Sequence, residues 1–131
     1  MAARLTLRID LGPDQAIGPG KIRLLETIAE TGSISQAGRA LGMSYRRAWL
    51  LVADLNQCFR EPVVAAQTGG ARGGGAALTR FGSQLVTHYR ALEQAAHDAG
   101  ARQLRQIDAA RRPPRKRAAS KRGAAADDSA G

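Results

Sequence analysis

Only three residues, Gly42-Met43-Ser44, separate two amphipathic segments, and this short connection limits the possible folds of the 131-residue chain most strongly. The segment before it follows the potential N-cap Ser33 and carries one apolar face, made of Ile34, Ala37 and Leu41. The segment after it runs from Ser44, a second N-cap, to about Phe59, with an apolar stripe made of Ala48, Leu51, Val52, Leu55 and Phe59. Two helices joined this closely must turn sharply, which is typical of a helix-turn-helix.

The residues in front of this pair predict a further helix and a short strand. From Lys21, apolar residues recur at helical spacing up to Gly32, a residue type that commonly ends helices; they are Ile22, Leu24, Leu25 and Ile28. A stretch rich in glycine and proline, residues 12–20, precedes this helix. Before it, residues 5–10 alternate apolar and polar side chains, which predicts a strand.

The residues behind the pair predict a hairpin and a long helix. Two short β-compatible runs, residues 63–67 and 76–78, flank the glycine-rich tip at residues 68–75. Thr79 can cap a fourth helix that extends to about Ala99. The whole order predicts an α+β, mostly helical fold: a winged helix-turn-helix with an N-terminal strand, a β-hairpin wing and a long C-terminal helix.

The C-terminal residues differ in composition from the rest. We expect a folded domain over residues 1–105 and a disordered basic tail over residues 106–131. Within residues 111–122 there are seven basic side chains and no acidic one: Arg111, Arg112, Arg115, Lys116, Arg117, Lys121 and Arg122. Such a tail predicts salt-dependent, nonspecific affinity for DNA, or a role in solubility alone.

Charge and cysteine content narrow the function further. The formal net charge is +9, so the expected partner is an anion: nucleic acid, an acidic membrane surface or an acidic protein. The single cysteine, Cys58, cannot form an internal disulfide, and His88 and His97 lack zinc-site spacing, so no metal or cofactor is expected. The N-terminus lacks the apolar core of a signal peptide and no segment could span a membrane, which predicts a cytoplasmic protein, without membrane association.

The first turn of the third helix is the strongest candidate for contact with DNA. It is polar and basic, and in a helix-turn-helix these positions enter the major groove; its residues are Ser44, Tyr45, Arg46 and Arg47. Arginine can hold guanine through two hydrogen bonds or neutralise a phosphate. Trp49 either lies against a sugar or a thymine methyl group or belongs to the core. The alternative is that the arginines form only a solvated face, but between Thr31 and Arg60 the only acid is Asp54.

Further contacts are expected from the neighbouring segments. We predict that the start of the second helix contacts phosphate through Ser33, Ser35 and Gln36. Arg72, at the glycine-rich tip, either enters the minor groove or belongs to an idle surface turn. The tip lacks the lysine of a phosphate-binding loop, so nucleotide binding is not predicted.

The fourth helix carries more apolar surface than a small helical core requires. Leu85, Tyr89 and Leu92 are therefore predicted to pair two copies of the chain, unless the helix folds back on its own domain. Catalysis is not predicted. Glu26 and Glu30 share one face of the first helix but stand on its polar side, and neither Cys58 nor the histidines have a triad partner.

The run GPGKIRLLETIAETGSISQAGRALGMSYRRAWLLVADLNQCFREPVV, followed by TGGARGGGAALTRFG, resembles the N-terminal DNA-binding domain of ModE-type molybdate-dependent transcriptional regulators. More distantly, it is similar to the winged helix of LysR-type regulators. The resemblance covers about Leu5 to Glu93. It implies that residues 44–59 form the recognition helix, that the hairpin is the wing and that the last helix pairs two subunits. ModE-type regulators also carry C-terminal oxyanion-binding domains where this sequence has a basic tail, so molybdate binding is not expected.

Together these features predict a homodimeric, sequence-specific regulator of transcription that binds double-stranded DNA in the bacterial cytoplasm or nucleoid. Two alternatives stay open. One is a nucleoid-type architectural protein, in which the tail dominates binding and sequence is hardly read. The other is an interaction module that has the winged-helix fold but does not bind DNA.

Overall fold

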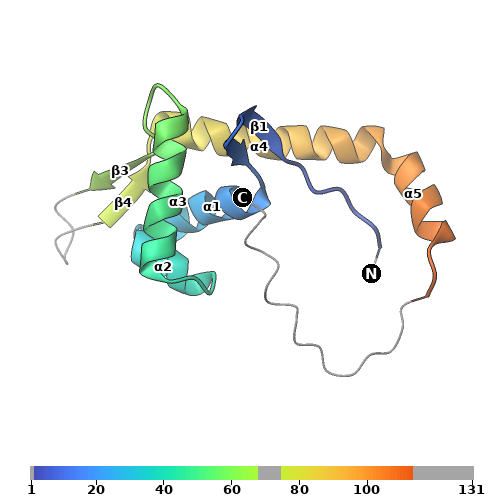
Figure 1. Ribbon diagram of the computed structural model, residues 1–131, viewed down its shortest axis with the longest axis horizontal. Helices are drawn as coiled ribbons and strands as arrows, with labels where there is room; N and C mark the ends of the chain where they lie inside the picture. Colours follow the sequence, from blue (N-terminus) through green and yellow to red (C-terminus); the bar gives the residue numbers. More distant parts are fainter. Residues whose placement is uncertain (1, 68–74, 114–131) are drawn as a thin grey trace.

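The computed structural model describes residues 2–67 and 75–113. Within them the chain forms β1 (Ile9–Gly12), β2 (Gln15–Ile17), α1 (Pro19–Thr31), α2 (Ile34–Ala40), α3 (Tyr45–Cys58), β3 (Val64–Gln67), β4 (Gly75–Leu78), α4 (Arg80–Ala99) and α5 (Ala101–Ala110). The order is that of the predicted winged helix-turn-helix. α1, α2 and α3 pack together beside the β3–β4 hairpin, and α4 runs behind them along the long axis of the molecule (Figure 1).

Local capping explains the turn between α2 and α3. The Ser33 hydroxyl accepts a hydrogen bond from the Gln36 amide at 3.0 Å, and that of Ser44 accepts one from the Arg47 amide at 3.1 Å, so both predicted N-caps are confirmed. Gly42, between the helices, has φ 74°, a conformation that glycine adopts without strain.

The core lies where α1 crosses the helix-turn-helix and α4. From α1 it takes all four predicted apolar residues, Ile22, Leu24, Leu25 and Ile28. From α3 it takes Ala48, Val52 and Leu55, whereas the predicted Leu51 and Phe59 are half-buried at its edge. The Phe59 ring packs edge-on against Phe81 of α4, with 5.0 Å between the ring centroids.

The β3–β4 hairpin is hydrogen-bonded to the end of α1. Its strands pair antiparallel, from Val64 opposite Leu78 to Gln67 opposite Gly75. The Ala76 amide donates to the carbonyl of Gly32, the residue that caps α1, at 3.0 Å. This hydrogen bond joins the second strand of the predicted wing to the end of α1.

The start of α4 lies against the residues that enter the hairpin. Thr79 caps α4, because its hydroxyl accepts from the Gly82 amide at 2.9 Å and also donates to the Pro62 carbonyl at 2.7 Å. Gly82 approaches the backbone so closely that a Cβ atom there would lie 2.1 Å from the Val63 carbonyl oxygen. Only glycine fits this position without a shift of the backbone.

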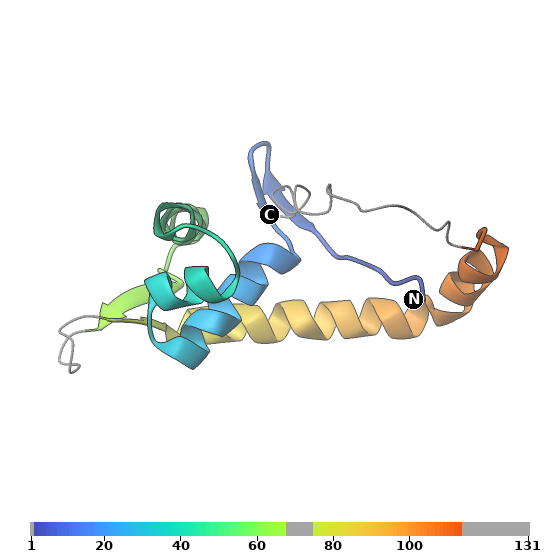
Figure 2. The same cartoon turned by 90° about the horizontal axis from the view of Figure 1, so that it is seen from below.

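The N-terminal segment corrects the prediction of a strand over residues 5–10. The strand begins at Ile9 instead and pairs with β2 across a turn at Pro13-Asp14, so the glycine- and proline-rich stretch is partly a hairpin. The residues before β1 run alongside α4 toward α5 (Figure 2). They are held by the Ala3 amide, which donates to the Asp108 carboxylate at 3.2 Å.

This segment covers Tyr89, which changes the interpretation of that residue. The Tyr89 side chain is fully buried within its own chain, and its hydroxyl donates to the Leu7 carbonyl at 2.6 Å. Burial raises the pKa of the hydroxyl. The prediction that Tyr89 contacts a second copy is therefore wrong, because its side chain is already buried within its own chain. The helical periodicity of α4 could not reveal that the N-terminal segment lies against this residue.

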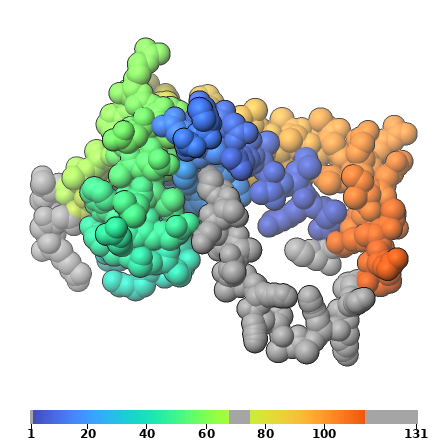
Figure 3. All heavy atoms as spheres, in the orientation of Figure 1, coloured from blue at the N-terminus to red at the C-terminus, as the bar shows by residue number. Residues whose placement is uncertain are grey.

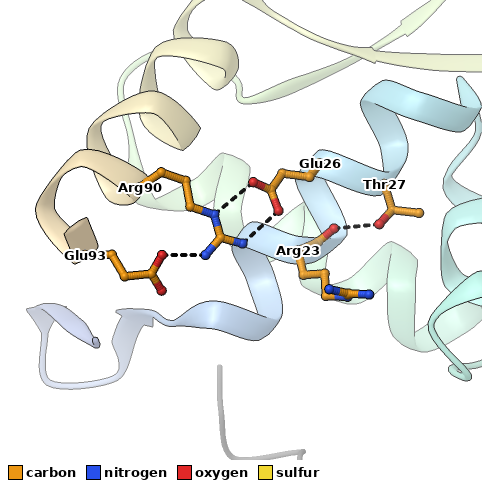
Figure 4. Close-up of polar contacts among 5 residues, drawn as sticks. All are labelled: Arg23, Glu26, Thr27, Arg90 and Glu93. Atoms are coloured by element: carbon orange, nitrogen blue, oxygen red, sulfur yellow. Dashed lines mark hydrogen bonds and ion pairs between the residues drawn. The ribbon is translucent and has the colours of Figure 1, made fainter. Parts of the chain in front are cut away.

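An ion-pair cluster joins α4 to α1. Arg90 of α4 lies between Glu26 of α1 and Glu93 of α4, and its guanidinium donates to both carboxylates (Figure 4). The hydrogen bonds from Arg90 hold the pKa of Glu26 below its ordinary value, against the opposing effect of burial.

The C-terminal boundary also differs from expectation. α5 continues to Ala110, so the boundary predicted after residue 105 falls inside a helix. Residues 101–110 are rich in alanine, arginine and glutamine, which favour helix without a large buried face. The tail from residue 114 onward and Arg72 lie outside the described residues.

No helix in residues 2–67 and 75–113 combines the length and apolar character required to cross a membrane.

Candidate nucleic-acid interface

α3 presents two different faces. Its inward face carries the core residues Ala48, Val52 and Leu55. Since successive residues turn by about 100° around a helix, the opposite face carries Arg46 and Leu50, and both are exposed. The outward face of the second helix of the helix-turn-helix is therefore free of contacts with the core.

The four residues predicted for the major groove, Ser44, Tyr45, Arg46 and Arg47, are all exposed at the start of α3. Ser44 also caps the helix, so its hydroxyl oxygen is already engaged with the backbone while its proton can still be donated. At the same end of the molecule, α2 and α3 form a block beside the hairpin, far from α5 (Figure 3). The structure therefore brings the predicted residues together on a single turn of an accessible helix.

A groove of about 570 Å³ lies between α3, the start of α2 and the hairpin. Four of the predicted site residues line it: Ser33, Ser35, Tyr45 and Trp49. The hairpin side is made of small residues, Ala65, Ala66, Gly75 and Ala76. Ser33 and Ser35 are half-buried, with their hydroxyl oxygens 3.3 Å apart, whereas Gln36 is exposed outside this groove.

The arginines lie on the other flank of α3. Arg46 and Arg47 line a hollow of about 330 Å³ together with Ser44, Leu50, Leu51 and Asp54. Asp54 is engaged by Lys21, whose ammonium lies 2.9 Å from the Asp54 carboxylate and 2.8 Å from the Ala16 carbonyl oxygen. Because the buried ammonium of Lys21 offsets the acid of α3, positive charge dominates this flank.

The structure adds residues that sequence reasoning missed. Asn56 fixes the hairpin to α3: its side-chain oxygen accepts from the amides of Val63 at 2.6 Å and Val64 at 3.2 Å, and its side-chain amide donates to the Val64 carbonyl at 3.3 Å. No periodic pattern signals such a bond between a side chain and the backbone. Leu50 was missed because it lies outside both the apolar stripe and the basic first turn.

Two of the groups considered for catalysis, Glu26 and Cys58, make structural contacts. Glu26 is engaged by Arg90, and the Cys58 thiol donates to the Asp54 carbonyl at 3.3 Å, with its pKa raised mainly by burial. In residues 2–67 and 75–113, no three histidine, cysteine or acidic side chains cluster as metal ligands.

Comparison with known proteins points to one class of domain. The sequence profile of bacterial regulatory helix-turn-helix proteins of the lysR family matches residues 20–83. The molybdenum transport protein ModE of Azotobacter vinelandii is 42% identical over 91 residues, which is 70% of this chain and 33% of that protein. The DNA-binding transcriptional dual regulator ModE of Escherichia coli (strain K12) is 40% identical over 94 residues, 72% of this chain and 36% of that protein.

A third relative carries a different name. The molybdenum-pterin-binding protein MopA of Rhodobacter capsulatus is 44% identical over 79 residues, which is 60% of this chain and 30% of that protein. The chain thus spans about a third of the length of these curated relatives.

Proposed function

Because residues 20–83 match the helix-turn-helix domain of lysR-family regulatory proteins, we propose that this protein binds double-stranded DNA sequence-specifically and regulates transcription. The single observation that carries the proposal is the start of α3, where four consecutive polar or basic residues, Ser44 to Arg47, are all exposed while the core is filled from Ala48, Val52 and Leu55. One relative is itself named a DNA-binding transcriptional regulator.

In this proposal α3 enters the major groove. Arg46 and Arg47 contact guanine or phosphate from one flank of the helix, and Ser44 and Tyr45 donate hydrogen bonds to phosphates or base edges. Trp49 lines the protein groove between α3 and the hairpin. In the complex its ring meets a sugar or a base edge of the DNA. The start of α2 contacts the phosphate backbone of the DNA through Ser33, Ser35 and Gln36.

The hairpin and the tail contribute in different ways. The hairpin base is bonded to α3 through Asn56, and we assign Arg72, from the glycine-rich sequence between the two strands, to the minor groove. The basic residues of 111–122 add affinity that depends on salt and not on sequence. A protein with this role acts where the chromosome lies, in the bacterial cytoplasm or nucleoid.

Dimerisation through α4 belongs to the same proposal. Leu92 is 51% exposed, and an apolar stripe continues along the same face of α4 through Ala91, Ala95 and Ala99. Leu85 is half-buried at the edge of the core and borders this stripe. A second copy would cover the stripe and present two α3 helices to a two-fold DNA site.

The matched part is about a third of each relative, so what their names say about molybdenum is not carried over to this chain. The proposal includes no cofactor, no oxyanion site and no enzymatic activity.

The test is selection of genomic DNA fragments at about 150 mM salt, near physiological ionic strength. The intact chain is compared with one truncated after Ala110, the last residue of α5. Enrichment of the same fragments by both proteins is expected, because sequence is read by α3. Loss of all binding with the tail, without enrichment by either protein, would favour the architectural alternative. No binding by either protein would favour an interaction module.

A further inference from the structure

Three large apolar side chains are exposed within six consecutive residues of α3. Tyr45 is 57% exposed, Trp49 is 49% exposed and Leu50 is 50% exposed. A single exposed leucine on a protein surface requires no explanation, but a cluster on one helix marks a contact surface. Tyr45 has a hydroxyl that can meet water or phosphate, whereas Trp49 and Leu50 present mainly hydrocarbon.

Packing within the chain does not explain Trp49 and Leu50. The core is already filled from α3 by Ala48, Val52 and Leu55, which lie opposite Leu50 and to one side of Trp49 around the helix. Trp49 lines the groove beside the hairpin, and Leu50 lines the hollow that also contains Arg46 and Arg47. Apolar side chains therefore stand on both flanks of the basic turn that begins the helix.

The charge around these side chains indicates what covers them. The first turn of α3 carries Arg46 and Arg47 and no acid, and Asp54, the one acid of α3, is engaged by Lys21. An apolar surface set among cations fits a partner that is anionic overall and offers small apolar groups. In the major groove of DNA that group is the C5-methyl of thymine, which apolar side chains contact.

We propose that Trp49 and Leu50 are specificity-determining residues that read thymine methyl groups on either side of the base pairs contacted by Arg46. The inference rests on the proposed DNA binding and deepens it. Because Trp49 and Leu50 lie about 100° apart around the helix, they reach thymines at different positions of the site.

The experiment replaces each thymine of a selected fragment by deoxyuridine, one position at a time, which removes only the methyl group. Binding of the full chain is measured at each position. Burial of one methyl group corresponds to about a fourfold change in affinity, so the unaltered protein should lose about fourfold at one or more positions. W49A and L50A should each become indifferent to deoxyuridine at a different one of these positions.

The matched control is I107A. Ile107 is also exposed, but it lies on α5 at the other end of the molecule (Figure 1), so this variant should keep the full deoxyuridine profile. The measurement on the unaltered protein is decisive even if a variant folds poorly.

Three results would overturn the proposal, and they differ in what they leave standing. Selection of fragments without any loss on deoxyuridine substitution refutes thymine reading but leaves the proposed function intact. The same holds if W49A and L50A keep the full deoxyuridine profile. Absence of any fragment selection refutes both, and the apolar side chains would then be assigned to a protein partner.

Discussion

Arg90 holds Glu26 through two parallel hydrogen bonds, from Nε to Oε2 at 2.9 Å and from Nη2 to Oε1 at 2.8 Å. The pair joins α1 to α4, elements that are far apart in the chain and lie against each other in the fold. A bidentate pair of this kind restrains direction as well as distance. The angle between α1 and the long helix α4 is therefore held by a charged contact as well as by the core.

Replacing Glu26 by glutamine should lower the free energy of unfolding by about 1 kcal/mol at neutral pH, the upper range for a partly exposed pair. Arg90 lowers the pKa of Glu26 in the folded state. The contribution of the ionised Glu26 to the free energy of unfolding is therefore complete above the unfolded pKa of about 4.3. It is lost as pH falls through the lowered pKa. Urea unfolding should show a smaller difference between E26Q and the unaltered protein at about pH 3. E30Q, at an exposed site on the same helix, should show little effect; an equal loss in E30Q would contradict the assignment.

Replacing Gly82 by alanine should destabilise the fold by about 2 kcal/mol, as forced overpacking does. The new Cβ would lie 2.1 Å from the Val63 carbonyl oxygen, and this is backbone that cannot rotate away. Urea unfolding measures the effect. The control is G12A, where the new Cβ would lie 3.8 Å from the Gln15 side chain. Similar stabilities of the two variants would show that α4 can move away from β3.

Replacing Tyr89 by phenylalanine should cost about 1 kcal/mol, because the part-buried Leu7 carbonyl loses its donor. Amide hydrogen exchange should increase in residues 3–8 and remain unchanged in α3. Y45F, which alters an exposed hydroxyl, should leave the stability unchanged. An N-terminal segment that stays equally protected in Y89F would argue that other contacts hold it.

Replacing Arg46 by glutamine should weaken binding to a selected fragment by about 1–3 kcal/mol, the range for one bidentate contact with a base. Binding to unrelated DNA should fall much less, so discrimination between the two decreases. Competition binding at fixed salt measures this ratio. R102Q on α5 removes the same charge far from α3 and should preserve discrimination. If both variants lose affinity equally for all sequences, Arg46 contacts only phosphate.

Replacing Leu92 by arginine should convert a dimer into a monomer, because a charge would be buried in the paired α4 stripe. Sedimentation velocity at micromolar concentrations measures the change. I107R adds the same charge at a more exposed site on α5 and should remain dimeric. A monomer for the unaltered protein would instead mean that α4 serves only its own domain.

The parts of the fold that depend on neighbouring residues could be predicted. Ser33, Ser44 and Thr79 each cap the helix that follows them, as their residue types and positions indicated. The inward face of α1 was also correct in every residue named, since helical periodicity alone decides it.

The errors concern contacts between segments distant in the sequence. Tyr89 fits an apolar stripe equally well whether a second copy or the N-terminal segment covers it, and only the path of the chain decides. The strand begins at Ile9 because the turn at Pro13-Asp14 determines which residues can pair. For the site, exposure of the basic turn followed from the pattern, but the groove against the hairpin depends on bonds made by Asn56. The DNA contacts of Ser44 to Arg47 stay predictions.

The hydrogen bond from Ala76 to Gly32 has a consequence for how the domain assembles. It closes a ring of backbone that contains all of α2, α3 and β3, so the two-helix unit lies inside a loop whose ends meet. Closing such a loop costs chain entropy before its contacts form, which slows folding relative to a purely local helical hairpin. The final orientation of α3 should therefore be reached only when the second strand of the hairpin docks. A ribosome-bound chain that ends near residue 60 would contain every residue of α3 but neither the hairpin that Asn56 holds nor the bond from Ala76 to Gly32.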